Sequence, residues 1–94
     1  MQKEDLVVEE IVIVQNSLGL HARPAAMLVE LASRFSSHIV VQKGKTEVNG
    51  KSIMGIMMLA AGKGSKLKIK IEGSDAQEAM VALKNLIKDK FNEE

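Results

Sequence analysis

Hydrophobic and polar residues alternate without interruption over residues 66–72, which read KLKIKIE. Strict alternation is typical of a β-strand with one buried face and one face in water. Residues 6–15 (LVVEEIVIVQ) and 38–43 (HIVVQK) are rich in valine and isoleucine, and the shorter segment 46–49 lies between two turn signals. We therefore predict four strands.

Two longer segments carry apolar residues every three or four positions, which predicts helices with one buried face. Residues 22–35 form the first helix, and Pro24 suits its first turn because a backbone N–H has no partner within the helix there. The second helix is predicted to begin at a capping box formed by Ser74 and Gln77. The expected buried positions are Ala25, Leu28, Val29, Ala32 and Phe35 in the first helix, and Ala76, Ala79, Met80, Leu83, Leu86, Ile87 and Phe91 in the second.

A short helix is predicted between these two, over residues 53–59, with Ser52 as its N-cap. The elements then follow the order strand, helix, strand, strand, helix, strand, helix. This order predicts an α+β fold, a two-layer open-faced sandwich in which a four-stranded, mainly antiparallel sheet has three helices on one face. The chain has 94 residues, which is enough for one domain. We expect this domain to span residues 1–94, with frayed ends at 1–5 and 92–94.

The composition narrows the classes of function. The sequence has no cysteine, which excludes a disulfide scaffold and cysteine–zinc sites. No apolar run approaches the ~20 residues that span a bilayer, and the acidic N-terminus lacks the features of a signal peptide. We therefore expect a cytoplasmic protein without membrane insertion. The only aromatic residues are two phenylalanines, with no tyrosine or tryptophan. This argues against a nucleic-acid-binding sheet that stacks bases on aromatic side chains.

The charge is unevenly distributed although the net charge is only +1. Seven lysines and one acid lie between residues 43 and 70. Lys66, Lys68 and Lys70 are expected on the open face of the sheet, where a solvated row is the favoured interpretation. Contact with nucleic-acid phosphates is the alternative for this row, but it is not the function we predict.

The candidate chemistry lies in residues 19–26, which read GLHARPAA. His21 stands at the entry to the first helix, and Arg23 follows two positions later. A helix N-terminus presents unpaired backbone N–H groups and about half a positive charge, and a guanidinium can hold phosphate oxygens in a fork. These features predict an anion bound beside His21, with no metal and no cofactor.

The cationic surroundings also favour neutral imidazole, whose nitrogen lone pair can attack phosphorus. The sequence contains no P-loop, no HExxH pair and no paired carboxylates near His21. Independent hydrolytic or kinase chemistry is therefore not predicted. A histidine that only caps the helix, next to a solvated Arg23, is the alternative for this position.

The motif GLHARPA and the segment KSIMGIMML (residues 51–59) resemble the HPr family. This family comprises the histidine-containing phosphocarriers of the bacterial phosphoenolpyruvate-dependent sugar phosphotransferase system. The first motif is similar to the family's active-site sequence, the second to the stretch around its regulatory serine. The resemblance covers nearly the whole chain, and it implies a phosphoryl carrier rather than a stand-alone enzyme.

The resemblance implies that His21 receives a phosphoryl group on Nδ1 from the phosphohistidine of enzyme I. The acceptor would be a histidine of an enzyme IIA domain. The resemblance also implies that Arg23 and the backbone N–H groups of Ala22 and Arg23 hold the phosphoryl group. An exposed helix end suits a carrier, because donor and acceptor proteins must both reach the site.

Ser52 resembles the serine that an ATP-dependent kinase phosphorylates in many members of the family. The implied further partners are an HPr serine kinase/phosphorylase and a transcription regulator. A phosphoserine adds about −1.5 to −2 charges, which suit a helix N-terminus but spoil an apolar docking surface beside it. A regulatory binding module controlled at Ser52, with His21 secondary, is an alternative function, and a plain N-cap is the alternative for the serine itself.

Partners are expected to dock on an apolar surface next to His21. The short helix is rich in methionine and cannot bury every side, and flexible methionine side chains fit several partners in turn. A monomer suits such a shuttle. The expected docking residues are Ala26, Met27, Ile53, Met54 and Met57.

Two branches of the family remain as alternatives for the pathway. Leu18, where sugar-system carriers usually have threonine, and the GKG run at 62–64 resemble the nitrogen-related branch, whose output is regulatory. The segment KSIMGIMML resembles the sugar branch. Sugar-branch relatives often have basic residues farther along the first helix, where this chain has Glu30 and Ser33.

Overall fold

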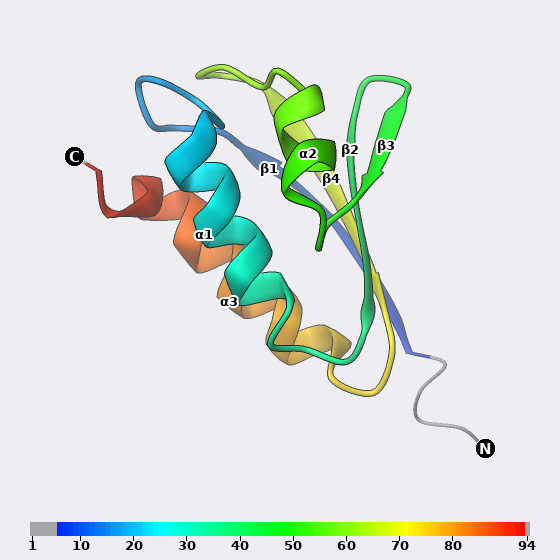
Figure 1. The fold of residues 1–94 in the computed structure, drawn as a ribbon. Coiled ribbons are helices and arrows are strands. Elements are labelled where there is room, and N and C mark those ends of the chain that lie inside the picture. Colours follow the sequence, from blue (N-terminus) through cyan, green and yellow to red (C-terminus); the bar gives the residue numbers. More distant parts are fainter. Residues whose placement is uncertain (1–5, 94) are drawn as a thin grey trace.

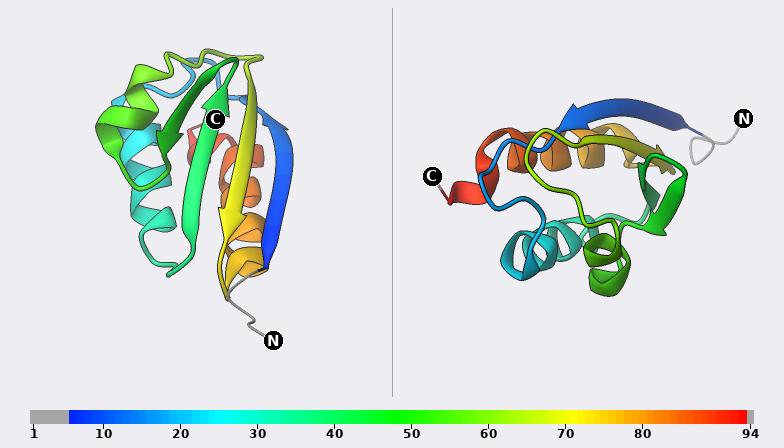
Figure 2. Two further views of the ribbon diagram at one scale, coloured as in Figure 1. Left: turned by 90° about the vertical axis from the view of Figure 1, so that its right-hand side faces the viewer. Right: turned by 90° about the horizontal axis from the view of Figure 1, so that it is seen from above.

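The computed structural model describes residues 6–93, and the predicted order of elements, β-α-β-β-α-β-α, is confirmed (Figure 1). Strands and helices form the predicted α+β open-faced sandwich, with the helices on one side of the sheet (Figure 2). The elements are β1 (Val7–Ile13), α1 (Ala22–Ala32), β2 (His38–Lys43), β3 (Thr46–Asn49), α2 (Ile53–Met58), β4 (Lys66–Glu72) and α3 (Ala76–Lys88), followed by a single 3₁₀ turn, η2 (Lys90–Asn92).

The sheet has the strand order β1-β4-β2-β3, and every neighbouring pair is antiparallel. β4 lies between β1 and β2 in the middle of the sheet, and the helical layer covers its inward face. Leu67, Ile69 and Ile71 of this strand are fully buried. The alternation of apolar and charged residues over β4 is therefore that of a strand with one face in the core and the other in water.

The open face of the sheet carries the lysine row of β4. Lys66 and Lys70 are exposed, and the Nζ atom of Lys68 lies 3.2 Å from a carboxylate oxygen of Glu9 on β1. This ion pair joins the two strands on the open face, where the β1 positions opposite Lys68 and Lys66 are the exposed Ile11 and Ile13.

α1 ends at Ala32, three residues before the predicted end. The N–H of Arg34 bonds to the carbonyl of Leu31, and that of Phe35 bonds to the carbonyl of Ala32. These bonds close the last turn with 3₁₀ spacing, which ends the helix. Phe35 still packs against the core from the following loop. The buried residues of the helix itself are Pro24, Ala25, Leu28, Val29 and Ala32.

The predicted capping box at the start of α3 is wrong. The N-cap is Asp75 rather than Ser74, and its side chain makes no hydrogen bond to the helix. Instead, the Asp75 carboxylate accepts hydrogen bonds from the backbone N–H groups of Ser36, at 2.9 Å, and Ser37, at 3.0 Å, and from both serine hydroxyls. This carboxylate fastens the loop after α1 to the start of α3.

The last helix ends before Phe91, the final buried position that the sequence predicts for it. α3 ends at Lys88, and all three residues of η2 have left-handed backbones, with φ between 56° and 59°. Phe91 is 1% exposed, so it is buried as predicted, but from a turn and not from the helix. Asn92 and Glu93, expected at a frayed end, directly follow this buried residue, as the last residue of η2 and its C-cap. Residues 1–5 and 94, the other residues expected to fray, lie outside the described part.

The Asp75 contact makes stability depend on pH. The Ser37 hydroxyl and the Ser36 N–H hold the pKa of Asp75 below its ordinary value of 3.8. A lowered pKa in the folded state stabilises the fold above about pH 4, and this contribution is lost as pH falls through the folded pKa. We predict that Asp75→Asn lowers the urea midpoint at about pH 7 and that the difference from the unchanged chain shrinks by about pH 3.

The matched control is Ser74→Ala, which should leave the urea midpoint nearly unchanged because Ser74 does not cap α3. Equal midpoints for Asp75→Asn and the unchanged chain at neutral pH would contradict the assigned role. So would a difference that stays constant across this pH range.

Candidate functional site

The loop between β1 and α1 is held against the loop that follows α2. The N–H of Leu20 donates to the carbonyl of Ala61 at 2.8 Å. Gly19 has a φ of 69°, and a Cβ atom there would collide with the Ala61 oxygen and lie 2.7 Å from Cα of Gly62. The sequence analysis did not predict this contact. Only glycine fits the left-handed backbone at so close an approach.

His21 follows directly and is the N-cap of α1, as predicted. Its backbone is extended, and its side chain makes no capping hydrogen bond to the helix. The ring therefore does not cap the helix, although His21 occupies the N-cap position. The side chain is 37% exposed, so the ring faces both the protein and solvent.

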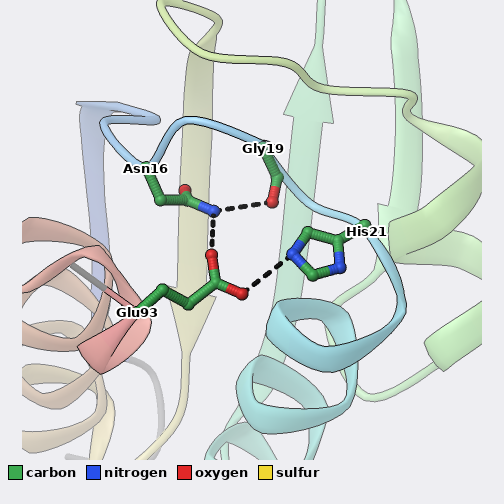
Figure 3. Close-up of polar contacts among 4 residues, drawn as sticks. All are labelled: Asn16, Gly19, His21 and Glu93. Carbon is green, nitrogen blue, oxygen red and sulfur yellow. Dashed lines mark hydrogen bonds and ion pairs between the residues drawn. The ribbon is translucent and has the colours of Figure 1, made fainter.

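A carboxylate from the other end of the chain meets the ring. Nε2 of His21 lies 2.8 Å from Oε2 of Glu93. Oε1 of Glu93 accepts a hydrogen bond of 2.9 Å from the amide nitrogen of Asn16, which also donates to the carbonyl of Gly19 at 2.8 Å (Figure 3). Asn16 is fully buried. One glutamate thus links the C-terminal segment to both Asn16 and His21 of the loop between β1 and α1.

Cationic and neutral donors lie on the helix side of the ring. The exposed Arg23 lines an open hollow of about 370 Å³ together with Ser17, Leu18, His21 and Glu93. Among residues 6–93, the Arg23 side chain has neither a hydrogen bond nor an ion pair. The backbone N–H groups of Ala22 and Arg23 open the helix and have no intrahelical partner. The geometry therefore offers an anion several unoccupied donors beside His21.

Ser52 lies at the start of α2, as predicted. Its Oγ atom accepts a hydrogen bond of 3.0 Å from the N–H of Gly55, so it is a true N-cap. Buried Ile56 packs this short helix against the core. The exposed fraction of Ile53 is 45%, and that of Met54 is 75%.

The remaining residues predicted for docking lie on the same two helices. Met57 of α2 is 43% exposed. Ala26 of α1 is exposed, and Met27 is partly buried against the core. α1 and α2 pack against each other, as Figure 2 shows from above. The structure therefore places the five predicted docking residues on two adjacent helices.

The sequence analysis missed Asn16 and Glu93. Glu93 lies 72 positions from His21 and 77 from Asn16, and no local pattern reports such contacts. The one sequence feature that could indicate the position of Glu93 is the apolar Phe91 two residues before it. The sequence predicts Phe91 as a buried residue of the last helix, whereas it is buried from the turn η2. The ring therefore has an anionic neighbour, Glu93, besides the cationic groups from which the sequence predicts neutral imidazole.

Comparisons with known proteins agree with the motif. A family profile described as "PTS HPr component phosphorylation site" matches residues 8–89. The chain is 48% identical over 88 residues to phosphocarrier protein HPr of Treponema pallidum (strain Nichols), covering 94% of this chain and 100% of that protein. It is 52% identical over 77 residues to the HPr-like protein Crh of Halalkalibacterium halodurans, covering 82% of this chain and 92% of that protein.

A solved structure extends the likeness to the fold. The crystal structure of HPr-C-His from Thermoanaerobacter tengcongensis matches with a TM-score of 0.89 at 50% identity, covering 93% of this chain and 98% of that one. Within residues 6–93, no helix has the length and apolar character needed to cross a membrane.

The close approach at Gly19 predicts a measurable loss of stability. Gly19→Ala must adopt a left-handed backbone, which costs about 1–2 kcal/mol, and must also push the loop at Ala61 away. We expect its free energy of unfolding in urea to fall by clearly more than that backbone cost.

Gly44→Ala is the matched control, because Gly44 has a φ of 59° and an added Cβ atom would find nothing within 4 Å. It should lose only the backbone cost of about 1–2 kcal/mol. Equal losses for the two variants would show that the approach of the two loops contributes nothing.

Proposed function

Because the chain belongs to the HPr family of phosphocarrier proteins of the bacterial phosphotransferase system, we propose that His21 is the residue that carries its phosphoryl group. The observation that supports this assignment most is the arrangement of the ring. Nε2 is hydrogen-bonded to Glu93, while Nδ1 has no partner among the described residues. The ring and Arg23 line the same hollow. Nδ1 is therefore the proposed acceptor atom.

In the proposed reaction, Nδ1 of His21 bonds to phosphorus as the phosphorus–nitrogen bond of a phosphohistidine on enzyme I breaks. The guanidinium of Arg23 and the N–H groups of Ala22 and Arg23 offset the charge of the transferred group. Transfer to a histidine of an enzyme IIA domain uses the same contacts in reverse. Donors at an exposed helix end release the group readily, which a carrier requires.

Membership of the family implies enzyme I and enzyme IIA domains as partners. We propose that both dock on the apolar surface that α1 and α2 form next to each other. The exposed side chains of Ile53, Met54 and Met57 supply most of its apolar area, and the proposal adds Ala26 and Met27. A single-domain, cytoplasmic monomer that binds neither nucleic acid nor membrane is part of this proposal.

Regulation through Ser52 is a second element of the proposal. A phosphoryl group on Oγ would lie at the N-terminus of α2, where negative charge is locally favourable. The same charge would stand next to exposed Ile53 and Met54 and weaken apolar docking. A serine kinase/phosphorylase and a transcription regulator are the partners that this element adds.

The downstream pathway has two candidates. The segment at residues 51–59 supports the sugar branch. Leu18, where sugar-system carriers usually have threonine, supports the nitrogen-related branch. It is 74% exposed and lines the hollow around His21, where a docked partner would meet it. The two are distinguished by which enzyme IIA domain accepts the phosphoryl group from the chain.

Labelling tests the proposed carrier residue. After incubation with enzyme I and phosphoenolpyruvate, mass spectrometry should locate one acid-labile, alkali-stable phosphoryl group on His21. His21→Ala should take up none, because it lacks the acceptor nitrogen. His38→Ala is the matched control, because His38 is the other histidine and lies exposed on β2.

Retention of the label by His21→Ala, or its loss from His38→Ala, would overturn the assignment. A parallel incubation with a serine kinase and ATP should place an acid-stable phosphoryl group on Ser52. Strong labelling of Ser52 combined with no labelling of His21 would favour the regulatory binding module instead.

The role of Arg23 gives a separate prediction. Arg23→Ala should slow phosphoryl transfer from enzyme I by at least about tenfold, because a charged donor to the transferred group is lost. Its stability should change by no more than about 0.5 kcal/mol, since Arg23 is exposed and makes no ion pair among residues 6–93.

Arg34→Ala, at the other end of the α1 segment, is the control and should transfer at the rate of the unchanged chain. Quenched transfer assays and urea unfolding measure the two quantities. A large loss of stability in Arg23→Ala with normal transfer would mean that Arg23 is structural.

A further inference from the structure

We propose that Glu93 is a positioning residue for His21, holding a proton on its Nε2 atom both before and after the ring takes up a phosphoryl group. This inference rests on the proposed role of His21 as the phosphoryl carrier. It gives the C-terminal segment a part in the reaction that neither sequence motif covers.

The hydrogen bond between these side chains decides which ring nitrogen reacts. An ionised carboxylate can only accept, so the proton in the 2.8 Å contact belongs to Nε2 of His21. A neutral imidazole carries one proton, and its lone pair then lies on Nδ1. Figure 3 shows Nδ1 on the side of the ring away from Glu93. The carboxylate therefore holds the ring with its reactive nitrogen on the opposite side.

Contacts that do not involve the ring fix Glu93 in place. Its Oε1 atom accepts from the amide nitrogen of Asn16, at 2.9 Å, and that nitrogen also donates to the carbonyl of Gly19. Because two acceptors face this atom of the fully buried Asn16, it must be nitrogen and not oxygen. The Glu93 side chain is only 12% exposed, and buried Phe91 anchors the turn before it.

Phosphoryl transfer adds a requirement that this carboxylate meets. When Nδ1 bonds to phosphorus and the donor's phosphorus–nitrogen bond breaks, no proton leaves the ring, so the ring becomes a phosphoimidazolium cation. Glu93 then faces a positive charge and stabilises it, as a carboxylate behind a catalytic imidazole does. When the group departs, the leaving group is neutral imidazole. Without the proton on Nε2 it would be imidazolate, which leaves poorly.

Two charged side chains face the ring among the described residues. Glu93 approaches Nε2 from the C-terminal segment, and Arg23 lies on the α1 side of the same hollow, together with the N-terminus of that helix. Ser17 and Leu18 complete the lining and carry no charge. Arg23 acts on the phosphoryl group and Glu93 acts on the proton, so their removal has different consequences.

Hydrolysis of the phosphorylated chain separates these roles. The unchanged chain, Glu93→Gln, Glu93→Ala and the control Glu78→Gln are loaded with excess enzyme I and phosphoenolpyruvate, freed of enzyme, and followed over a range of pH. Glu78 is an exposed glutamate in the first turn of α3, so its variant makes the same charge change elsewhere. Loss of the phosphoryl group from His21 is measured by mass spectrometry.

Hydrolysis is fast when Nε2 is protonated and slow when it is not. The midpoint of the rate profile in Glu93→Gln and Glu93→Ala should therefore lie lower by roughly half a pH unit or more, as expected for a partly exposed charge pair. Above the midpoint, the unchanged chain should hydrolyse severalfold faster, whereas in acid all rates should converge. Glu78→Gln should match the unchanged chain throughout.

Coincident profiles for the Glu93 variants and the unchanged chain would overturn this inference while leaving the carrier function intact. A uniform change at every pH would also overturn it, because that result indicates a structural effect. A Glu93 variant that excess enzyme I cannot load contradicts it as well, since the ring keeps its acceptor nitrogen and only its positioning and the stability of its proton change. If His21 of the unchanged chain takes up no label, the proposed function itself fails.

Discussion

The position of His21 depends on a short loop that is held from both sides. On one side, Gly19 and Leu20 rest against the carbonyl of Ala61, at a distance that leaves no room for a Cβ atom. On the other, buried Asn16 connects the loop to Glu93. With its backbone fixed in this way, the residue before α1 cannot join the helix, and its ring stands at the helix N-terminus beside the unpaired N–H groups.

This arrangement divides the work of a phosphoryl carrier among separate parts of a small domain. In the proposed function, Arg23 and the first amides of α1 supply positive charge, Glu93 supplies a fixed acceptor on the opposite side of the ring, and α2 supplies exposed apolar area. The hollow around His21 opens to solvent, which suits the proposed function, in which two partners enter it in turn. The sheet holds these parts in register without taking part in the chemistry.

The sequence predicted the regular elements well because their patterns are local. The alternation in β4 and the N-cap at Ser52 both depend on neighbours a few residues away, and both are confirmed. The capping box at Ser74 failed because a carboxylate one residue on, Asp75, bonds across to the loop after α1. Glu93 was missed for the same reason, since a left-handed turn at a buried phenylalanine carries it to a ring 72 positions away.

The proposed chemistry rests on one claim about the imidazole ring: Nε2 of His21 keeps its proton against Glu93, and Nδ1 bonds to phosphorus. Nuclear magnetic resonance of ¹⁵N-labelled chain loaded by enzyme I tests it directly, through the coupling of ³¹P to the two ring nitrogens. The predicted result is phosphorus coupled to Nδ1 of His21, with a proton on Nε2 that exchanges slowly. Phosphorus on Nε2, or on any other residue, would contradict the statement.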